Sequence, residues 1–283
     1  MVCISNFIKS PLNYVGGKFK LLPQIIPLFP DSINTFIDLF AGGCNVGVNV
    51  NANRILLNDT QEEVINLVKY LYENDVNTLI EELEGIMDKF SLNAWEKEPY
   101  LALRDAYNNG DKSEMMFYAL VVHSFSNQIR FNRHGKFNMP VGKRTFNPQL
   151  RKRFITFVDV IKQKNLTFST CDFATLKSSK LNEDDFVYCD PPYLVTTAAY
   201  NEQGGWSEEH EFKLFNLLDE LNENDIKFAL SNVFENKGKK NDILIEWSRK
   251  YKIHYLNNTY SNCNYQAKDK SKNSTVEVLV TNY

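Results

Sequence analysis

A short apolar run that ends in a carboxylate and two prolines limits the fold of this chain more than any other stretch. The run Phe186-Val187-Tyr188-Cys189 is typical of a buried strand, and Asp190-Pro191-Pro192-Tyr193 follows it directly. Two consecutive prolines can neither extend a hydrogen-bonded strand nor continue a helix, so the strand must end here. The carboxyl ends of strands face the ligand crevice in an open α/β sheet. The sequence therefore predicts a stiff loop at a ligand site.

The loop carries one carboxylate and one aromatic ring, which together can bind a flat amine. The Tyr193 ring can stack on a base, and the Asp190 carboxylate can accept a hydrogen from the exocyclic amino group. This pair suits methylation of the N6 nitrogen of adenine. The expected catalytic residues are Asp190, Pro191, Pro192 and Tyr193. The alternative is a rigid turn in which Tyr193 only packs.

A glycine-rich turn follows another strand-like run near the start of the chain. The run 34–40 leads into Gly42-Gly43 with G-G-x-x-x-G spacing, and a helix is expected after the turn, as in nucleotide cradles. The next strand, 54–59, ends at Asp59, seventeen residues after Gly42. An acid at about this distance can bind the ribose hydroxyls of a nucleotide. The alternative role of Asp59 is a helix cap, because a helix start follows it.

Strand-like and helix-like segments alternate at both ends of the chain. Further strands are expected at 166–170, 226–230, 253–256 and 276–280, with helices at 148–164, 209–222 and 243–250. The block between these ends is helical at 61–110 and 115–124, and then alternates apolar and polar residues around Gly135, which predicts a β-hairpin. The expected architecture is a doubly wound, Rossmann-like α/β sheet formed by 1–60 and 148–283, with residues 61–147 inserted.

Charge is distributed unevenly, although the formal net charge is only −3. The segment 59–114 contains fourteen acids and five Lys or Arg, whereas 115–158 contains no acid. The basic residues of the acid-free stretch are Arg130, Arg133, Lys136, Lys143, Arg144, Arg151, Lys152 and Arg153. Such a stretch is a candidate phosphate-binding face, and a solvated surface is the alternative. Arg130 lies on a hairpin narrow enough for the major groove, where it could bind guanine or only phosphate.

Neither the cysteines nor the histidines predict a metal site. The five cysteines are scattered without a C-x-x-C pair, and the four histidines are isolated, so neither a metal nor a disulfide framework is expected. The first twenty residues lack the apolar core of a signal peptide, and no segment approaches the roughly 18 apolar residues that span a bilayer. We expect a soluble, intracellular protein with no membrane partner.

These motifs resemble the D12-class, Dam-like DNA adenine-N6 methyltransferases over nearly the whole chain. Their order, with the cofactor motif before the recognition block and the catalytic motif last, is the alpha-type order. The resemblance is carried by Asn13-Tyr14-Val15-Gly16-Gly17-Lys18, Asp38-Leu39-Phe40-Ala41-Gly42-Gly43, Asn58-Asp59, the hairpin from Arg130 to Pro140, Cys171-Asp172-Phe173, the Asp190–Tyr193 motif and Val280-Thr281-Asn282-Tyr283.

The resemblance implies a site-specific enzyme that transfers a methyl group from S-adenosyl-L-methionine to adenine N6 in duplex DNA, with base flipping. The cofactor would be lined by Tyr14, Lys18 and Phe40, with its methionine moiety at Asp38, Gly42 and Gly43, its ribose at Asp59, its adenine at Asp172 and Phe173, and Asp190 also in contact with it. The insertion would be the target-recognition domain, contacting DNA through Arg130, Asn132, Arg133, Lys136, Asn138, Lys143 and Arg144.

The resemblance also implies a biological setting. A GATC-like site is one candidate, although Asn127-Gln128-Ile129 replaces the Asn-Gly-Leu of close Dam relatives. The implied partners are double-stranded DNA and a cognate restriction endonuclease. The protein would be a monomer in the cytoplasm of a prokaryotic or phage-infected cell.

Two other classes of function remain open from the residues alone. The first is methylation of RNA, a protein amide or a small amine. The basic hairpin and the aspartate of the Asp190 motif favour DNA as the substrate instead. The second is a DNA-binding or dinucleotide-binding regulator without catalysis, against which the intact carboxylate motif argues.

Overall fold

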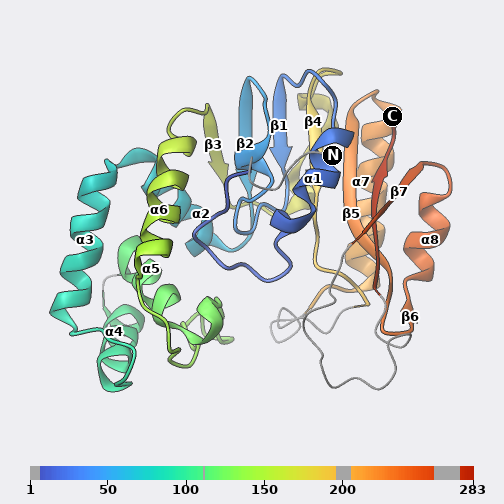
Figure 1. The fold of residues 1–283 in the computed structure, drawn as a ribbon. Helices are drawn as coiled ribbons and strands as arrows, with labels where there is room; N and C mark the ends of the chain where they lie inside the picture. The colour runs from blue at the N-terminus through green and yellow to red at the C-terminus, as the bar shows by residue number, and fades with distance from the viewer. Residues whose placement is uncertain (1–6, 111, 196–204, 258–274) are drawn as a thin grey trace.

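The computed structural model describes residues 7–110, 112–195, 205–257 and 275–283, and its centre is one eight-stranded mixed sheet (Figure 1). The strands run in the order β3-β2-β1-β4-β5-β8-β7, and β6 pairs with β5. Their bounds are β1 Thr35–Asp38, β2 Arg54–Asn58, β3 Leu166–Ser169, β4 Phe186–Cys189, β5 Lys227–Asn236, β6 Lys239–Lys240, β7 Lys252–Leu256 and β8 Thr275–Thr281.

Eight α-helices occur in the described part of the chain, and none of them is long and apolar enough to cross a bilayer. They are α1 Leu22–Ile25, α2 Glu62–Glu73, α3 Val76–Lys89, α4 Glu98–Asn109, α5 Glu114–His123, α6 Pro148–Ile161, α7 Glu208–Glu223 and α8 Asp242–Ser248. A short 3-10 helix, η2 (Lys18–Leu21), precedes α1.

The strand order reverses between β1 and β4, and this confirms the predicted doubly wound fold. Strands β1 to β5 pair in parallel, whereas β8 is antiparallel to both β5 and β7. The loops that leave β1 and β4 turn away on opposite sides of the reversal, which in open α/β sheets creates the ligand crevice. The predicted glycine turn and the Asp190 loop are these two loops.

Alternate residues of the central strands enter two different cores, because successive side chains of a strand point to opposite faces. Phe36 and Tyr188 belong to the core that contains α1, whereas Ile37 and Val187 belong to the core formed with α7 and α8. Both faces are therefore buried, which explains why the central strands read as unbroken apolar runs.

The inserted block is a helical bundle built around α5. The sequence of α5 is apolar on all sides, and every residue from Phe117 to His123 is buried. Helices α2, α3 and α4 pack around it, and α6 contacts α2 and α3 (Figure 1). Tyr72 of α2 also packs on Phe168 of β3, with ring centroids 5.6 Å apart. The bundle therefore shares one core with the sheet, and the 61–147 boundaries stay a prediction.

The predicted hairpin at 127–140 reverses the chain but forms no extended strands. Its pairing consists of the antiparallel bridge Phe131–Phe137 and of backbone hydrogen bonds such as Asn138 N to Arg130 O at 3.0 Å. The Phe137 N–H and C=O point away from the opposite strand, because Phe131 and Phe137 form a non-hydrogen-bonded pair, and the Asn108 side chain of α4 bonds both of them. The hairpin is thus fixed to the bundle by helix α4.

No α-helix follows the glycine turn, so this prediction was wrong. The chain makes only the 3-10 turn Gly47–Asn49. The Asn49 amide is used instead to bind the N–H and C=O of Ile8, at 2.7 and 2.8 Å. The turn therefore anchors the N-terminal segment that carries Tyr14 and Lys18.

Gly47 has no room for a side chain, and Gly47→Ala is expected to destabilise the protein by about 1–3 kcal/mol through overpacking. A Cβ atom there would lie 2.4 Å from Leu57 Cδ2 and 3.1 Å from Asp38 Oδ2. Gly85 of α3 is the matched control, because nothing lies within 4 Å of its Cβ position. Gly85→Ala should stabilise the helix by roughly 0.5–1 kcal/mol. Urea unfolding of both variants measures the two effects, and equal effects would contradict the close packing at Gly47.

Candidate active site

The Asp190 loop meets the N-terminal segment at a buried ion pair. Lys18 Nζ lies 2.9 Å from Asp190 Oδ1, and the two side chains are 3% and 17% exposed. The Tyr193 hydroxyl donates to the same Oδ1 at 2.9 Å, and the Lys18 ammonium lies 4.9 Å from the centre of the Tyr193 ring. The structure thus brings together three of the predicted site residues from two segments far apart in the sequence.

The two oxygens of the Asp190 carboxylate differ in what they contact. Both donors, Lys18 and Tyr193, bind Oδ1, and Oδ2 makes no hydrogen bond with any part of the chain that the structure describes. Burial raises the pKa of Asp190, while Lys18 and Tyr193 oppose that rise. The site therefore presents one carboxylate oxygen that can accept a hydrogen from a bound amine.

Two carboxylates hold the glycine turn in shape. Asp59 Oδ2 accepts from the Gly42 N–H at 2.7 Å and Oδ1 accepts from the Gln61 N–H at 2.9 Å. Asp38 Oδ2 accepts from the Gly47 N–H at 3.0 Å. Asp59 therefore bonds both the glycine turn and the N–H of Gln61, which is the N-cap residue of α2, and its ribose-binding role stays a prediction.

Tyr14 lies against the glycine turn. Gly42 has a φ of +47°, and a Cβ atom there would approach the Tyr14 ring to 2.9 Å. At Gly43 the corresponding distance to Tyr14 Cβ is 3.0 Å. Only glycine gives both the backbone angle and this close approach. Tyr14, Gly42 and Gly43 thus form one wall, and their binding of the cofactor stays a prediction.

Asp38 is a buried carboxylate with one oxygen unused. Asp38 is only 1% exposed, and its Oδ1 has no hydrogen-bond partner among the residues that are described. Burial raises the pKa of Asp38 to about 8, although the hydrogen bond from Gly47 opposes the shift. A buried carboxylate with an open oxygen favours a cationic ligand at this position.

The raised pKa of Asp38 makes stability depend on pH. Between the ordinary value of 3.8 and about 8, the folded protein holds a proton that the unfolded chain has lost. Stability must then fall as the pH rises, by up to about 1.4 kcal/mol per pH unit. Asp38→Asn should remove this contribution, so the ligand-free variant should gain stability relative to wild type from pH 5 to 8. Urea unfolding at four pH values tests this, and parallel curves for the two proteins would contradict it.

Aromatic rings form a second wall beyond the glycine turn. Phe40 and Phe173 have centroids 5.4 Å apart, and Trp206 lies 5.8 Å from Phe40 and 5.5 Å from Phe173. Asp172 is exposed beside them, and its Oδ1 accepts from the Ala174 N–H at 2.8 Å. Phe40 and Phe173, which were both predicted to bind the cofactor, are therefore in contact, and Asp172 lies at the edge of this aromatic wall.

Asn58 joins the ends of three neighbouring strands. Its Nδ2 donates to Leu39 O and to Cys171 O, both at 3.0 Å, and its Oδ1 accepts from the Cys171 N–H at 3.1 Å. These bonds fix the loops after β1 and β3 relative to the end of β2. Asn58 thereby positions the segments that carry Phe40, Asp59 and Asp172.

Most of the predicted DNA-binding side chains are used within the hairpin itself. Arg130 Nε donates to Asn138 Oδ1 at 2.9 Å, and its NH2 group donates to Asn138 O at 3.0 Å. Asn132 Oδ1 accepts from the His134 and Lys136 N–H groups, which shapes the turn. Arg133 and Lys143 are exposed, and Arg144 donates to Asn127 Oδ1 at 3.0 Å.

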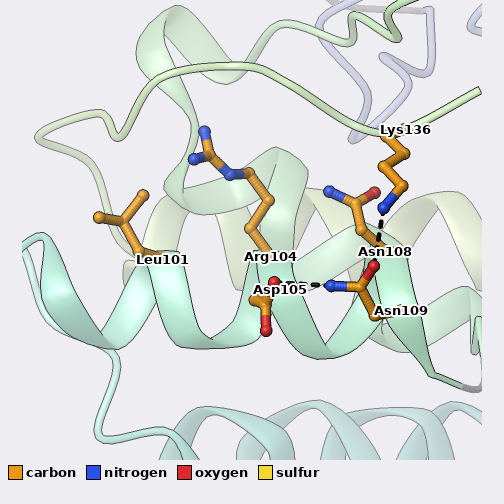
Figure 2. A pocket seen from close by; sticks show the side chains of 6 residues that line it. All are labelled: Leu101, Arg104, Asp105, Asn108, Asn109 and Lys136. Carbon is orange, nitrogen blue, oxygen red and sulfur yellow. Dashed lines mark hydrogen bonds between the residues drawn. The ribbon is translucent and has the colours of Figure 1, made fainter. Parts of the chain in front are cut away.

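Lys136 borders a hollow between α4 and the hairpin. Figure 2 shows its ammonium directed at Asn109, and the distance from Lys136 Nζ to Asn109 Oδ1 is 2.7 Å. The hollow has a volume of about 330 Å³, and none of the predicted cofactor or catalytic residues lines it. Its lining residues are Leu101, Arg104, Asp105, Asn108, Asn109 and Lys136. Lys136 therefore bonds to the bundle as well as lying on the basic stretch.

Comparison with known proteins gives the family. The family model of the D12 class N6 adenine-specific DNA methyltransferases matches residues 14–262. The chain belongs to this family. It is 42% identical over 99% of its length to the type II methyltransferase M.FokI of Planomicrobium okeanokoites, and 40% identical over 98% to the modification methylase StsI of Streptococcus sanguinis. It covers 43% of each of these two relatives, less than half of their length.

A shorter relative of this D12-class chain matches it nearly end to end. The type II methyltransferase M1.LlaDCHI of Lactococcus lactis subsp. cremoris is 29% identical, over 96% of this chain and 94% of that protein. The matched region includes the crevice residues from Tyr14 through Tyr193. The D12-class assignment therefore agrees with the geometry of the crevice.

Three residues of this D12-class site were not predicted as site residues. They are Asn58, Trp206 and Glu277, of which Glu277 lies 3.7 Å from Lys18 Nζ. A charged residue inside the apolar run 276–280 was the one available signal for Glu277, because charges in buried strands need a partner. Within the described residues, no group of three or more His, Cys, Asp or Glu side chains is arranged to hold a metal ion.

Proposed function

We propose that this chain transfers a methyl group from S-adenosyl-L-methionine to N6 of adenine within a short sequence of duplex DNA. The observation that carries the proposal is the open Oδ2 of Asp190, which lies at the sheet's reversal point on the loop that also carries Tyr193. Family membership supports the reaction class. Because the chain spans less than half of its first relatives, the activity of the whole protein is part of this proposal.

The residues around the crevice fit the proposed cofactor, which carries a sulfonium, an ammonium and a carboxylate. Among the described residues around the crevice, the acids Asp38, Asp59 and Asp190 outnumber the buried cation Lys18, and this balance favours a ligand with net positive charge. The open Oδ1 of Asp38 suits the ammonium. We assign the ribose to Asp59 and the adenine ring to Phe40, Phe173 and Asp172. When bound, the cofactor would supply an activated methyl group on sulfur.

The chain's own residues would prepare the target nitrogen. The N6 lone pair of adenine is delocalised into the ring, so the amine is a poor nucleophile. Accepting its hydrogens at Asp190 Oδ2 and at the Pro191 carbonyl would favour the pyramidal nitrogen that attacks. Tyr193 would stack on the flipped base, a contact worth about 1–3 kcal/mol in comparable pairs. Pro191 and Pro192 keep these groups fixed, so positioning supplies much of the rate.

The proposal extends to the setting of the enzyme. We assign DNA recognition to the insertion at 61–147, and propose a cytoplasmic monomer that acts with a cognate restriction endonuclease. The relatives named above are a type II methyltransferase and a modification methylase, which supports this setting. The recognition sequence is left open between GATC-like and other short sites.

A methyl-transfer assay on three substrate classes tests the proposal. The protein is incubated with labelled S-adenosyl-L-methionine and with unmethylated duplex DNA, RNA or a protein extract, and cofactor binding is measured separately. Transfer to DNA adenine is expected. Transfer to RNA or protein alone would favour the alternative methyltransferases, and cofactor binding without any transfer would favour a non-catalytic binder.

Arg130→Ala is expected to lower the rate on the cognate site more than on sites altered at the contacted guanine. Arg130 NH1 makes no bond to the part of the chain that is described, so the guanidinium keeps donors for a base while Asn138 orients it. Loss of a base contact should remove about 1–3 kcal/mol of discrimination. Rates on cognate and single-substituted duplexes at two salt concentrations measure this.

Lys143→Ala is the control for Arg130. Lys143 is exposed on the same basic stretch, and a phosphate contact by it should weaken all DNA equally and reduce the salt slope by about one unit. A uniform loss in the Arg130 variant would assign Arg130 to the phosphate backbone instead.

A further inference from the structure

A buried glutamate on strand β8, Glu277, lies beside the ion pair of Lys18 and Asp190. Glu277 Oε1 lies 3.7 Å from Lys18 Nζ, whose distance to Asp190 Oδ1 is 2.9 Å. The Glu277 and Lys18 side chains are 4% and 3% exposed. The Lys18 ammonium also donates to Gly16 O at 2.8 Å. One buried cation is therefore shared between two carboxylates from separate segments.

We propose that Glu277 is a positioning residue of methyl transfer, which shares the Lys18 ammonium with Asp190 and so keeps Asp190 a strong hydrogen acceptor. The inference rests on the proposed function, because it concerns the amine acceptor of that reaction. Glu277 itself touches neither the target amine nor the cofactor in this assignment. It acts on Asp190 through Lys18 and through its own charge.

The sharing follows from the chemistry of lysine. Its ammonium is a compact charge with three donors, and here it faces three oxygen acceptors, from Asp190, Gly16 and Glu277. If Lys18 faced Asp190 alone, the full positive charge would lie on Oδ1 and would weaken acceptance at Oδ2. A second carboxylate leaves the trio with a net charge of −1, which makes Asp190 more basic.

The packing of β8 makes this arrangement rigid. Glu277 pairs with Val233 of β5 on one side and with Leu256 of β7 on the other, so its backbone is held by two neighbouring strands. Its position is therefore independent of the Asp190 loop. The charges of Lys18 from η2 and Glu277 from β8 and the hydroxyl of Tyr193 act on Asp190, and the Asp190 charge in turn raises the pKa values of Tyr188, Cys189 and Asp38.

Burial raises the pKa of Asp190. The contacts with Lys18 and Tyr193 lower this pKa, whereas Glu277 raises it further because it is a like charge. Asp190 must be ionised to accept the amine hydrogen, so the rate should fall on the acid side of its pKa. Glu277→Gln removes the like charge and should move this acidic limb to lower pH. Lys18→Met removes the opposite charge and should move it to higher pH. The two variants therefore shift the limb in opposite directions.

The test measures single-turnover methyl transfer to duplex DNA across pH for wild type, Glu277→Gln, Lys18→Met and the control Glu235→Gln. Glu235 is half-buried on the neighbouring strand β5, and its variant should behave as wild type. For Glu277→Gln we expect a plateau rate lower by about tenfold, equal to one pKa unit of interaction. Its KM for S-adenosyl-L-methionine should change by less than about threefold, which separates an effect on chemistry from one on binding.

A second measurement does not depend on activity. The Asp190 carboxyl is titrated by carbon NMR in ligand-free protein labelled at aspartate, with Asp190→Asn to assign the signal. A lower Asp190 pKa in Glu277→Gln is expected. An unmoved or raised pKa, or a slower variant with an unmoved acidic limb, would overturn the proposal. If the wild type were inactive but the Asp190 pKa were still lowered in Glu277→Gln, the proposed reaction would be refuted and the shared Lys18 charge would be supported. The two failures are therefore distinguishable.

Discussion

Asp190→Ala is expected to lower the rate of methyl transfer to DNA by about 10²–10⁴-fold, the range typical of a lost proton acceptor. The variant removes the open Oδ2 that we assign to the target amine. Affinity for S-adenosyl-L-methionine should change far less, because the glycine turn and the aromatic wall do not depend on Asp190. Single-turnover rates and a separate cofactor titration measure the two effects. A near-normal rate would contradict the assignment.

Asp190→Asn is the matched variant that separates chemistry from folding. Alanine leaves the buried Lys18 ammonium with Glu277 as its remaining carboxylate, which should cost stability. Asparagine has nearly the same shape, and its oxygen can still accept from Lys18 and Tyr193. Its amide nitrogen would then face the target amine and could not accept a hydrogen. Asp190→Asn should therefore melt closer to wild type than Asp190→Ala and still be inactive.

Asp59→Ala is expected to weaken S-adenosyl-L-methionine binding by roughly 10- to 150-fold, equal to about 1.5–3 kcal/mol for a hydrogen bond to a charged group. The variant removes the proposed ribose acceptor and also the bond that holds the Gly42 N–H at 2.7 Å. Both losses act on the same wall of the crevice. Calorimetric titration of the cofactor measures the change.

Asp75→Ala is the control for Asp59. Asp75 caps the start of α3, where its Oδ1 accepts from the Asn77 and Thr78 N–H groups. Its loss should lower stability slightly without changing cofactor affinity. If Asp59→Ala lowered stability in the same way and left the dissociation constant unchanged, Asp59 would be a helix cap alone.

The central strands and the crevice residues were predictable because their signals are local. The run 186–189 followed by two prolines determines where β4 ends, and the glycines after β1 mark the second loop. In a doubly wound sheet these two ends border the same crevice, where the glycine turn and the Asp190 loop lie. The sequence likewise predicted a separate helix at 115–124, where α5 lies.

The features that sequence missed depend on contacts between distant segments. The position of β8 between β5 and β7 is set by pairing with both, and Glu277 reaches Lys18 only because of it. The hairpin pairs through the Phe131–Phe137 bridge and not through extended strands, and Asn108, from another helix, binds the outward-facing backbone groups of Phe137. The segment 44–53, between the glycine turn and β2, forms no α-helix, and Asn49 of that segment binds Ile8. None of these partners is specified by the local residue pattern.

Sequencing of genomic DNA after expression in a methylation-free host tests the central claim most directly. Wild-type protein is predicted to leave N6-methyladenine at one short sequence throughout the genome, and Asp190→Ala is predicted to leave none. Cytosine methylation, or N6-methyladenine at equal levels with both proteins, would contradict the account.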